Sequence, residues 1–170
     1  MIRYLNISIK FFIILGIACV LFVFSTLWYF SIGLPDYKKL SNYQPPISSR
    51  VYSNNGKLIA EYALEKRLFI PFDSIPKKVI NSFLSAEDKN FFNHPGVDAK
   101  GIIRALIKNL KNVAGNKRLE GASTITQQVA KNFLLTNEVS LNRKIKEAIL
   151  AFRIERAYSK ERILELYLNQ

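Results

Sequence analysis

The chain opens with an apolar run that predicts a membrane-spanning helix. Residues 11–34 contain no charged side chain. As an α-helix they would be roughly 36 Å long at ~1.5 Å per residue, enough to cross a hydrocarbon core of about 30 Å. A buried core helix is the alternative, and a cleaved signal peptide fits less well because the run is longer than a signal-peptide core. We therefore expect an uncleaved signal-anchor.

Flanking charges orient this anchor. Arg3 and Lys10 precede the apolar run, which favours residues 1–10 in the cytoplasm. Lys38 and Lys39 follow it closely and weaken that bias. The long remainder of the chain must lie on one side of the membrane, and we expect it outside the cytoplasm.

The segment after the anchor predicts a linker and then a β-hairpin. Residues 36–46 are polar and end in two prolines, which is typical of a stiff linker. Within residues 50–62, Asn55 and Gly56 lie between two half-apolar runs and predict a two-residue hairpin turn. A third short strand is expected over residues 67–72.

From about residue 76 the pattern becomes helical. Ser74 is expected to cap the first helix, Asp98 the second, and Thr124 the third through a capping box with Gln127. Two more helices are expected, over residues 141–158 and from 159 onward. The second helix, about 98–112, carries an apolar stripe that is expected to face inward, formed by Ile102, Ile103, Leu106, Ile107 and Leu110.

The expected architecture is therefore mainly α behind one transmembrane helix, with a small β-hairpin element. Residues 35–72 would be the linker and the hairpin stem. Residues 73–170 would form one domain, because the helical stretches follow one another with short connections.

Composition limits the partners and the chemistry. The chain has 25 basic and 13 acidic side chains and a net charge of +12, most of it after the anchor. A basic domain outside the cytoplasm would meet anionic lipid head groups or pyrophosphates rather than nucleic acid. Single Cys19 and single His94 exclude a disulfide framework and a Cys- or His-rich metal site, so no resident metal is expected.

Glu87 is the first candidate for chemistry. At about 100° per residue it shares the apolar face of its helix with Val79, Phe83 and Leu84. A carboxylate there would be partly desolvated, which makes it a better proton acceptor near neutral pH. The alternative is a structural carboxylate at a helix end.

Two further groups could bind a charged substrate. The small and hydroxyl residues of 121–128 open a helix, whose free N–H groups suit phosphate or carbohydrate oxygens, with ordinary capping as the alternative. Arg143, Lys144 and Glu147 share one helix face and could hold a pyrophosphate, with a solvated ion-paired face as the alternative. Glu155 belongs to neither group, so we expect Glu155→Gln to be near neutral.

Four segments carry a resemblance to a known family. They read EDKNFFNHPG at 87–96, GASTITQQ at 121–128, RKIKE at 143–147 and ILELYLN at 163–169. In this order they resemble the motifs E-D-x-x-F-x-x-H-x-G, G-x-S-T-I-T-Q-Q, R-K-x-x-E and I-L-E-x-Y-L-N of the bacterial family 51 peptidoglycan glycosyltransferases. These are the lipid II polymerases of class A penicillin-binding proteins. The resemblance implies a lysozyme-like, mainly α lobe with a smaller membrane-facing jaw.

The resemblance also implies roles for the motif residues. Glu87 would be the catalytic base that deprotonates the acceptor sugar hydroxyl, which attacks the anomeric carbon of the lipid-pyrophosphate-linked donor with inversion. Glu147, the second catalytic residue, would serve the pyrophosphate with Arg143 and Lys144, directly or with a divalent cation. The substrate-binding site would further include Asp88, His94, Ser123, Thr124, Gln127 and Gln128. The first two of these would brace the site rather than react.

The implied location is the bacterial cytoplasmic membrane, crossed once. The implied partners are lipid II, the growing glycan strand and other cell-wall synthesis proteins. Relative to the family, the glycosyltransferase domain is expected to be incomplete at its C-terminal side. Two other functions stay open: a lysozyme-like glycan hydrolase with Glu87 as general acid, and an inactive membrane-anchored remnant. The hydrolase needs no pyrophosphate site, so Arg143 and Lys144 favour the polymerase.

Overall fold

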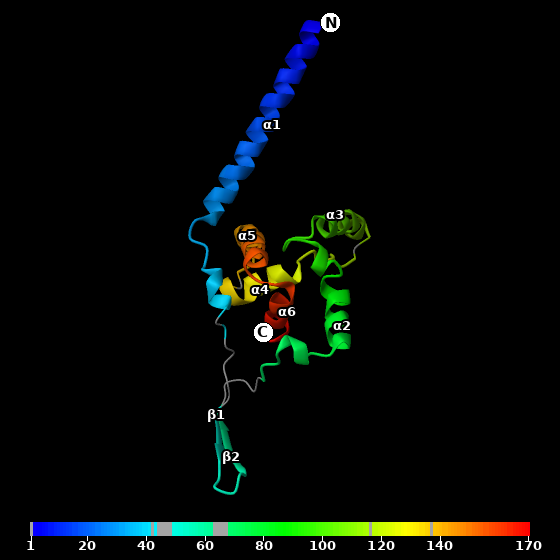
Figure 1. The fold of residues 1–170 in the computed structure, drawn as a ribbon. Coiled ribbons are helices and arrows are strands. Elements are labelled where there is room, and N and C mark those ends of the chain that lie inside the picture. The colour runs from blue at the N-terminus through cyan, green and yellow to red at the C-terminus, as the bar shows by residue number, and fades with distance from the viewer. Residues whose placement is uncertain (1, 42, 44–48, 63–67, 116, 137) are drawn as a thin grey trace.

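The fold is mainly helical, as the sequence predicts. The computed structural model describes residues 2–41, 43, 49–62, 68–115, 117–136 and 138–170. The α-helices after the first are α2 (Lys77–Glu87), α3 (Ala99–Ala114), α4 (Ile125–Leu134), α5 (Leu141–Ala157) and α6 (Lys160–Leu168). α4, α5 and α6 form the centre, with α2 and α3 to one side, while the first helix and the hairpin project from opposite ends (Figure 1).

The membrane-spanning prediction corresponds to α1 (Ile2–Ser31), which extends away from the domain (Figure 1). Its stretch Lys10–Ser31 is long and apolar enough to cross a membrane and is not buried by the rest of the structure. The helix ends at Ser31 in a turn at Ile32 and Gly33, so the last residues of the predicted span lie outside it.

The expected stiff linker is wrong for the part that the structure describes. A short 3₁₀ helix, η1 (Tyr37–Leu40), follows α1, and Leu40 is buried in the core. The hydroxyl of Tyr158 donates to the carbonyl of Tyr37 at 3.0 Å, and Arg162 donates to the carbonyl of Leu40 at 3.2 Å. Burial of Leu40 and these bonds make the segment part of the domain. The two prolines lie outside the described residues.

The hairpin is confirmed, with a different turn. β1 (Ser49–Tyr52) pairs antiparallel with β2 (Leu58–Tyr62). The loop is one residue longer than predicted, because the N–H of Ser53 donates to the carbonyl of Lys57 and closes it around three residues. Gly56 closes the loop at φ +77°, a left-handed conformation that glycine adopts without strain.

The third strand is not formed in residues 68–72. Instead, the backbone of this segment pairs with side chains of α6. Asn169 accepts from the N–H of Ile70 at 2.8 Å and donates to its carbonyl at 2.9 Å, and Glu165 accepts from the N–H of Phe72 at 2.7 Å. Ser74 ends the 3₁₀ helix η2 (Phe72–Ser74) and does not cap α2, which begins after Pro76.

The other caps are confirmed. Asp98 accepts from the N–H of Gly101 at the start of α3, and Thr124 forms the capping box of α4 with Gln127. These caps satisfy backbone N–H groups that a helix start leaves without an intrahelical partner. The core then forms where α4, α5 and α6 meet, from the fully buried side chains of Ile125, Val129, Leu150, Ile154, Ile163, Leu164 and Leu166.

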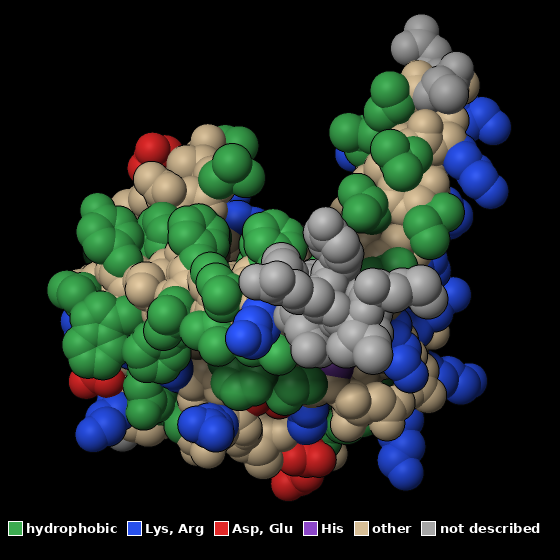
Figure 2. Space-filling view, turned by 90° about the horizontal axis from the view of Figure 1, so that it is seen from above, with side chains coloured by type: hydrophobic (Ala, Val, Ile, Leu, Met, Phe, Trp, Pro, Cys, Tyr) green, Lys and Arg blue, Asp and Glu red, His purple; other side chains and the backbone are tan. Residues whose placement is uncertain are grey.

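The apolar stripe of α3 does not face inward, contrary to the prediction. Its five residues are 42–68% exposed, whereas Gly101 and Ala105, on another side of this helix, are buried. The stripe has no core to cover because α3 lies beside the bundle, on the side from which α1 leaves (Figure 1). Seen from that side, hydrophobic side chains gather over the surface, interrupted by a few basic ones (Figure 2).

Candidate active site

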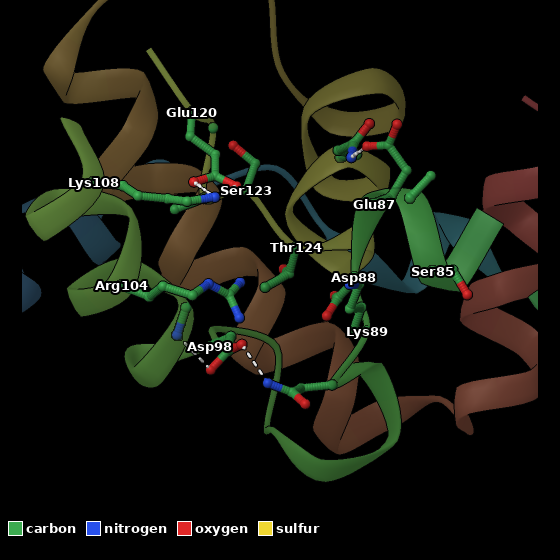
Figure 3. A pocket seen from close by; sticks show the side chains of 16 residues that line it. Ser85, Glu87, Asp88, Lys89, Asp98, Arg104, Lys108, Glu120, Ser123 and Thr124 are labelled. Atoms are coloured by element: carbon green, nitrogen blue, oxygen red, sulfur yellow. Dashed lines mark hydrogen bonds and ion pairs between the residues drawn. The ribbon is translucent and has the colours of Figure 1, made fainter. Parts of the chain in front are cut away.

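A polar cleft of about 480 Å³ lies between the end of α2, one side of α3 and the segment that leads into α4. Figure 3 shows its lining side chains. Glu87 lies at one edge, at the last residue of α2, and Ser123 and Thr124 come from the segment before α4. Arg104 and Lys108 reach into the cleft from α3 (Figure 3). Two of the four motifs, which are distant in sequence, therefore share one cleft.

Glu87 is exposed to this cleft, so the expected partial desolvation is wrong. Its carboxylate accepts a hydrogen bond from the side-chain amide of Gln128 at 2.9 Å. The helical wheel correctly placed Glu87 beside Val79 and Phe83, but these two side chains are themselves about 40% exposed. Ile80 is the only residue of α2 that is fully buried, so the shared face opens outward. The Glu87 carboxylate is consequently accessible from the cleft.

Asp88 and His94 form a buried pair beneath Glu87. Nε2 of His94 lies 3.0 Å from both carboxylate oxygens of Asp88. Nδ1 of His94 accepts from the N–H of Gly96 at 3.2 Å, so Nε2 carries the ring proton and donates to Asp88. Asp88 also accepts from the N–H of Ile125 at 3.1 Å, at the start of α4. Asp88 and His94 therefore connect the first motif to the second through hydrogen bonds.

Gly96 brings the first motif against α5. Its φ is +97°, and a Cβ added there would lie 2.7 Å from the carbonyl oxygen of Ala151. Only glycine fits that approach without a shift of the backbone. The hydroxyl of Thr124 donates to the carbonyl of Gly96 at 2.6 Å. The turn after His94 is thus held from two sides, and with it the segment that carries Glu87.

The second motif divides into structural and accessible residues. Thr124 and Gln127 are buried, and each binds the other's backbone N–H, at 3.2 and 3.0 Å. Ser123 and Gln128 are only partly buried and both line the cleft. Thr124 and Gln127 therefore cap α4. Ser123 and Gln128 instead present accessible polar groups to the cleft.

The third motif forms a cationic cluster, Arg143 and Lys144, around a buried carboxylate. Glu147 is 1% exposed, so the alternative of a solvated ion-paired face is wrong. Nζ of Lys144 donates to Glu147 at 2.6 Å and to the hydroxyl of Ser123 at 2.7 Å. Nε of Arg143 lies 3.2 Å from the other oxygen of Glu147. The Lys144 side chain is 44% exposed, so its ammonium is available beside the cleft.

The Glu147 carboxylate lies between the two cations of the cluster. One of its oxygens accepts a hydrogen bond from Lys144, whereas the other, 3.2 Å from Nε of Arg143, is buried and accepts no hydrogen bond from the part of the chain that the structure describes. Among the described residues, no group of three or more His, Cys, Asp or Glu side chains is arranged to hold a metal ion. Arg143 and Lys144 supply positive charge at this site.

Two structural features were missed by sequence reasoning. Glu155 is not a neutral position: it accepts from the hydroxyl of Thr126 at 2.6 Å and from Lys160 at 2.8 Å. Lys160 also donates to the carbonyl of His94 at 2.7 Å and lies over the ring of Phe91. This network joins α4, α5 and α6 under the first motif, so we expect Glu155→Gln to destabilise the fold rather than to be near neutral. The sequence feature that could have revealed this network is the helical spacing, which places Glu155 on the buried face of α5.

Arg104 and Lys108, which the sequence did not single out, belong to the same helix as the apolar stripe. They lie on the other side of α3, at the spacing of one turn, where basic residues alternate with that stripe. Lys108 is paired with Glu120 across the cleft at 3.0 Å. The side of the cleft opposite Glu87 therefore combines two basic side chains, Arg104 and Lys108, with the carboxylates of Asp98 and Glu120 (Figure 3).

The pKa values of two groups near the cleft are displaced. The backbone N–H of Gly101 lowers the pKa of the Asp98 carboxyl, and the side-chain amide of Asn90 lowers it further. Burial raises the pKa of the Tyr167 hydroxyl, and the nearby charge of Glu87 raises it further. The fourth motif thus places a neutral phenol near the candidate base.

Comparison with known proteins identifies the class. A model of the transglycosylase family matches residues 55–170, more than half of the chain. The chain belongs to the transglycosylase family, which confirms the resemblance to the peptidoglycan glycosyltransferases and the mainly α fold.

The individual relatives narrow the resemblance to one kind of protein. The chain is 61% identical over 144 residues to penicillin-binding protein 1A of Rickettsia felis, covering 85% of the chain and 18% of that protein. It is 60% identical over 144 residues to penicillin-binding protein 1A of Rickettsia conorii, with the same coverage. It is 46% identical over 159 residues to penicillin-binding protein 1A of Aquifex aeolicus, covering 92% of the chain and 22% of that protein. The chain spans about a fifth of the length of these curated relatives.

Proposed function

We propose that this chain polymerises lipid II into glycan strands by inverting glycosyl transfer from a lipid-pyrophosphate donor. The family match supports a peptidoglycan glycosyltransferase in general. The single observation that carries the finer proposal is the placement of an exposed carboxylate, Glu87, and an accessible ammonium, Lys144, on one cleft system joined at Ser123.

Glu87 acts as the general base. Its carboxylate is open to the cleft and is oriented by the amide of Gln128. It accepts the proton of the acceptor sugar hydroxyl while that oxygen forms a bond to the donor's anomeric carbon. The bond from this carbon to the pyrophosphate oxygen breaks on the opposite face, so the configuration inverts and no covalent enzyme intermediate is needed.

The cationic cluster receives the charge of the leaving group. As the glycosidic bond breaks, negative charge develops on the departing pyrophosphate, and fixed cations stabilise that charge without reorganising. Lys144 is held in place by Glu147 and Ser123, so its ammonium is preorganised. Glu147 is buried among its partners and acts by positioning Lys144 and Arg143 rather than by touching the sugar.

The exposed apolar stripe of α3 supports a membrane-facing role for this side of the molecule. Lys10–Ser31 would cross the bilayer once, with the domain outside the cytoplasm. The stripe would then lie at the bilayer surface, as an amphipathic helix does when one face is apolar and the other basic. This arrangement would bring the cleft to the level at which lipid-linked sugars are presented.

The test is Glu87→Gln in the purified chain, incubated with lipid II in detergent. Gln keeps the shape of the side chain but cannot accept the proton, so the rate of polymer formation should fall by about 10²–10⁴-fold. Thermal stability should change little because the carboxylate is exposed. The matched control is Glu161→Gln, since Glu161 is exposed on α6 and lies outside the cleft.

Each alternative predicts a different product. A hydrolase would release short, soluble sugars from a glycan strand and would not lengthen lipid-linked chains. An inactive remnant would give neither product from the parent chain. Polymer formation by Glu87→Gln at the parent rate, in a folded protein, would show that the mechanism given above is wrong.

A further inference from the structure

The side of the polar cleft opposite Glu87 is built from α3 and from the segment that leads into α4. Asn109 joins these two elements, because its amide donates to the carbonyl of Glu120 at 3.0 Å and its side-chain oxygen accepts from the N–H of Glu120 at 2.7 Å. Asn112 adds a bond to the carbonyl of Arg118 at 3.1 Å. These hydrogen bonds hold the segment against α3 and fix the shape of this side.

Charged side chains of both signs line this side of the cleft. We call them the α3 wall, and they are Asp98, Arg104, Lys108 and Glu120. Asp98 is held by the N–H of Gly101 at 3.0 Å, and Lys108 lies 3.0 Å from Glu120. Arg104 is exposed and extends into the cleft (Figure 3). Its guanidinium forms neither a hydrogen bond nor an ion pair with any residue that the structure describes, so it is available to a substrate.

Charge balance selects the kind of group that fits the α3 wall. Two cations and two carboxylates leave no net charge there, whereas the cluster of Arg143 and Lys144 has one carboxylate, Glu147, for two cations. A pyrophosphate carries only negative charge, so it is favoured at that cluster and is repelled by half of the α3 wall. The α3 wall instead complements a group that carries carboxylates and an ammonium together.

We infer that the α3 wall binds the peptide that lipid II carries on one of its sugars, and that the cleft selects acceptors by the charges of this peptide. The inference rests on the proposed function and adds the peptide part of the substrate to it. The peptide has free carboxylates and, on its diamino residue, a free ammonium. Arg104 binds a carboxylate of the peptide, and the carboxylates of Asp98 and Glu120 attract its ammonium.

Position also favours the peptide. Glu87 lies on the opposite side of the same cleft, so a sugar that has one hydroxyl at Glu87 leaves the space in front of α3 to its substituents (Figure 3). A sugar without its peptide offers no charged partner to the guanidinium of Arg104. Arg104 and Lys108 lie on a different side of α3 from its apolar stripe, so a lipid surface beneath the stripe does not cover them.

The test is polymerisation of two substrates by two chains in detergent. The substrates are lipid II and a synthetic lipid II whose peptide carboxylates are all amidated, and the chains are the parent and Arg104→Gln. With lipid II, Arg104→Gln should lower kcat/KM by about tenfold, mainly through KM, because a charged hydrogen bond made before and during the reaction is lost. With the amidated substrate, the two chains should differ by less than about twofold.

Arg118→Gln is the matched control, since it removes the same charge from an exposed position outside the cleft lining, and it should match the parent with both substrates. Glu120→Gln tests the opposite charge, and its loss of kcat/KM should disappear with lipid II whose peptide amine is acetylated. Thermal melting checks that both variants are folded. A loss that is equal for lipid II and its modified form, or no loss with lipid II, would overturn the inference.

Binding measured without turnover separates this inference from the proposed function. The chains then also carry Glu87→Gln, and Arg104→Gln should raise the Kd for lipid II by about tenfold and leave the Kd for amidated lipid II unchanged. This result, with no polymer from the parent chain, would support the peptide site and contradict the proposed function. Polymer formation by the parent, with an effect of Arg104→Gln that does not depend on the charge of the peptide, would support the function and contradict the peptide site.

Discussion

Replacing Glu147 by Gln perturbs the side chain that forms ion pairs with both cations of the cluster. The parent carboxylate accepts from Lys144 at 2.6 Å, and its second oxygen lies 3.2 Å from Nε of Arg143. A Gln amide offers one acceptor, so one cation keeps a partner and the other faces an N–H donor. The variant therefore removes a buried negative charge while it preserves the volume of the side chain.

The loss of stability can be bounded from the burial of the three groups. Removing one partner of a fully buried ion pair costs about 3–5 kcal/mol. Here the Lys144 side chain is 44% exposed and can turn to water, so its share must be discounted for solvent screening. Hydrogen bonds to charged groups contribute about 1.5–3 kcal/mol. We therefore expect a loss of about 2–3 kcal/mol, which lowers Tm by roughly 4–12 °C in a chain of this size.

The assay is thermal melting of the chain in detergent, for Glu147→Gln, Lys144→Met and the double variant. Both single changes break the same ion pair between Lys144 and Glu147. The double variant should therefore lose less free energy of unfolding than the sum of the two single losses, with a coupling of at least about 1 kcal/mol. Glu161→Gln, at an exposed position, should melt with the parent. If Glu147→Gln also melts within about 1 °C of the parent, the carboxylate does not hold the cluster together and the positioning role assigned above fails.

Two further predictions follow from the cap of α3 and from the charges around α1. The pKa of Asp98 is lowered, so its stabilising contribution is present above the unfolded value of 3.8 and is lost as the pH falls through the folded pKa. The Tm difference between the parent and Asp98→Asn, which keeps a cap without the charge, should therefore be constant at pH values well above 3.8 and shrink as the pH is lowered below 3.8. A difference that stays constant throughout would contradict this prediction. A reporter enzyme that works only outside the cytoplasm should be active when fused after Gln170, and activity of a cytoplasmic reporter at the same site would reverse the proposed topology.

The sequence predicted local structure where the signal was local. Asp98 and Thr124 begin helices because their side chains accept from N–H groups two or three residues ahead, a relation that short-range spacing reveals. The same holds in part for the hairpin, where Asn55 and Gly56 located the reversal of the chain although the loop is one residue longer than predicted. The motifs located Glu87, Lys144 and Ser123, which the fold then brings to one cleft system.

Exposure could not be predicted in the same way. The helical wheel gives the face that Glu87 shares with Val79, but not what lies opposite that face. It likewise grouped Arg143, Lys144 and Glu147 correctly without revealing that Glu147 is buried. Glu155 was judged neutral because its partners, Thr126 and Lys160, come from other helices. These errors share one cause, since burial depends on contacts between elements and not on periodicity.

The misplaced apolar faces of α3 and α5 have a common explanation. In a protein surrounded by water, an amphipathic helix turns its apolar stripe to the core and its charges outward. Here α5 buries Glu147 and opens Ile145 and Phe152 to a groove, and α3 exposes Ile103 and Leu106. Leu27 of α1 lines the same groove, and α3 lies on the side of the bundle from which α1 leaves (Figure 1). On the proposed topology this side meets lipid, where an exposed apolar side chain costs nothing and a buried ion pair keeps its charge out of hydrocarbon. On the proposed topology, an apolar face open to that side costs little, and a lipid-linked donor would reach Lys144 without leaving the membrane.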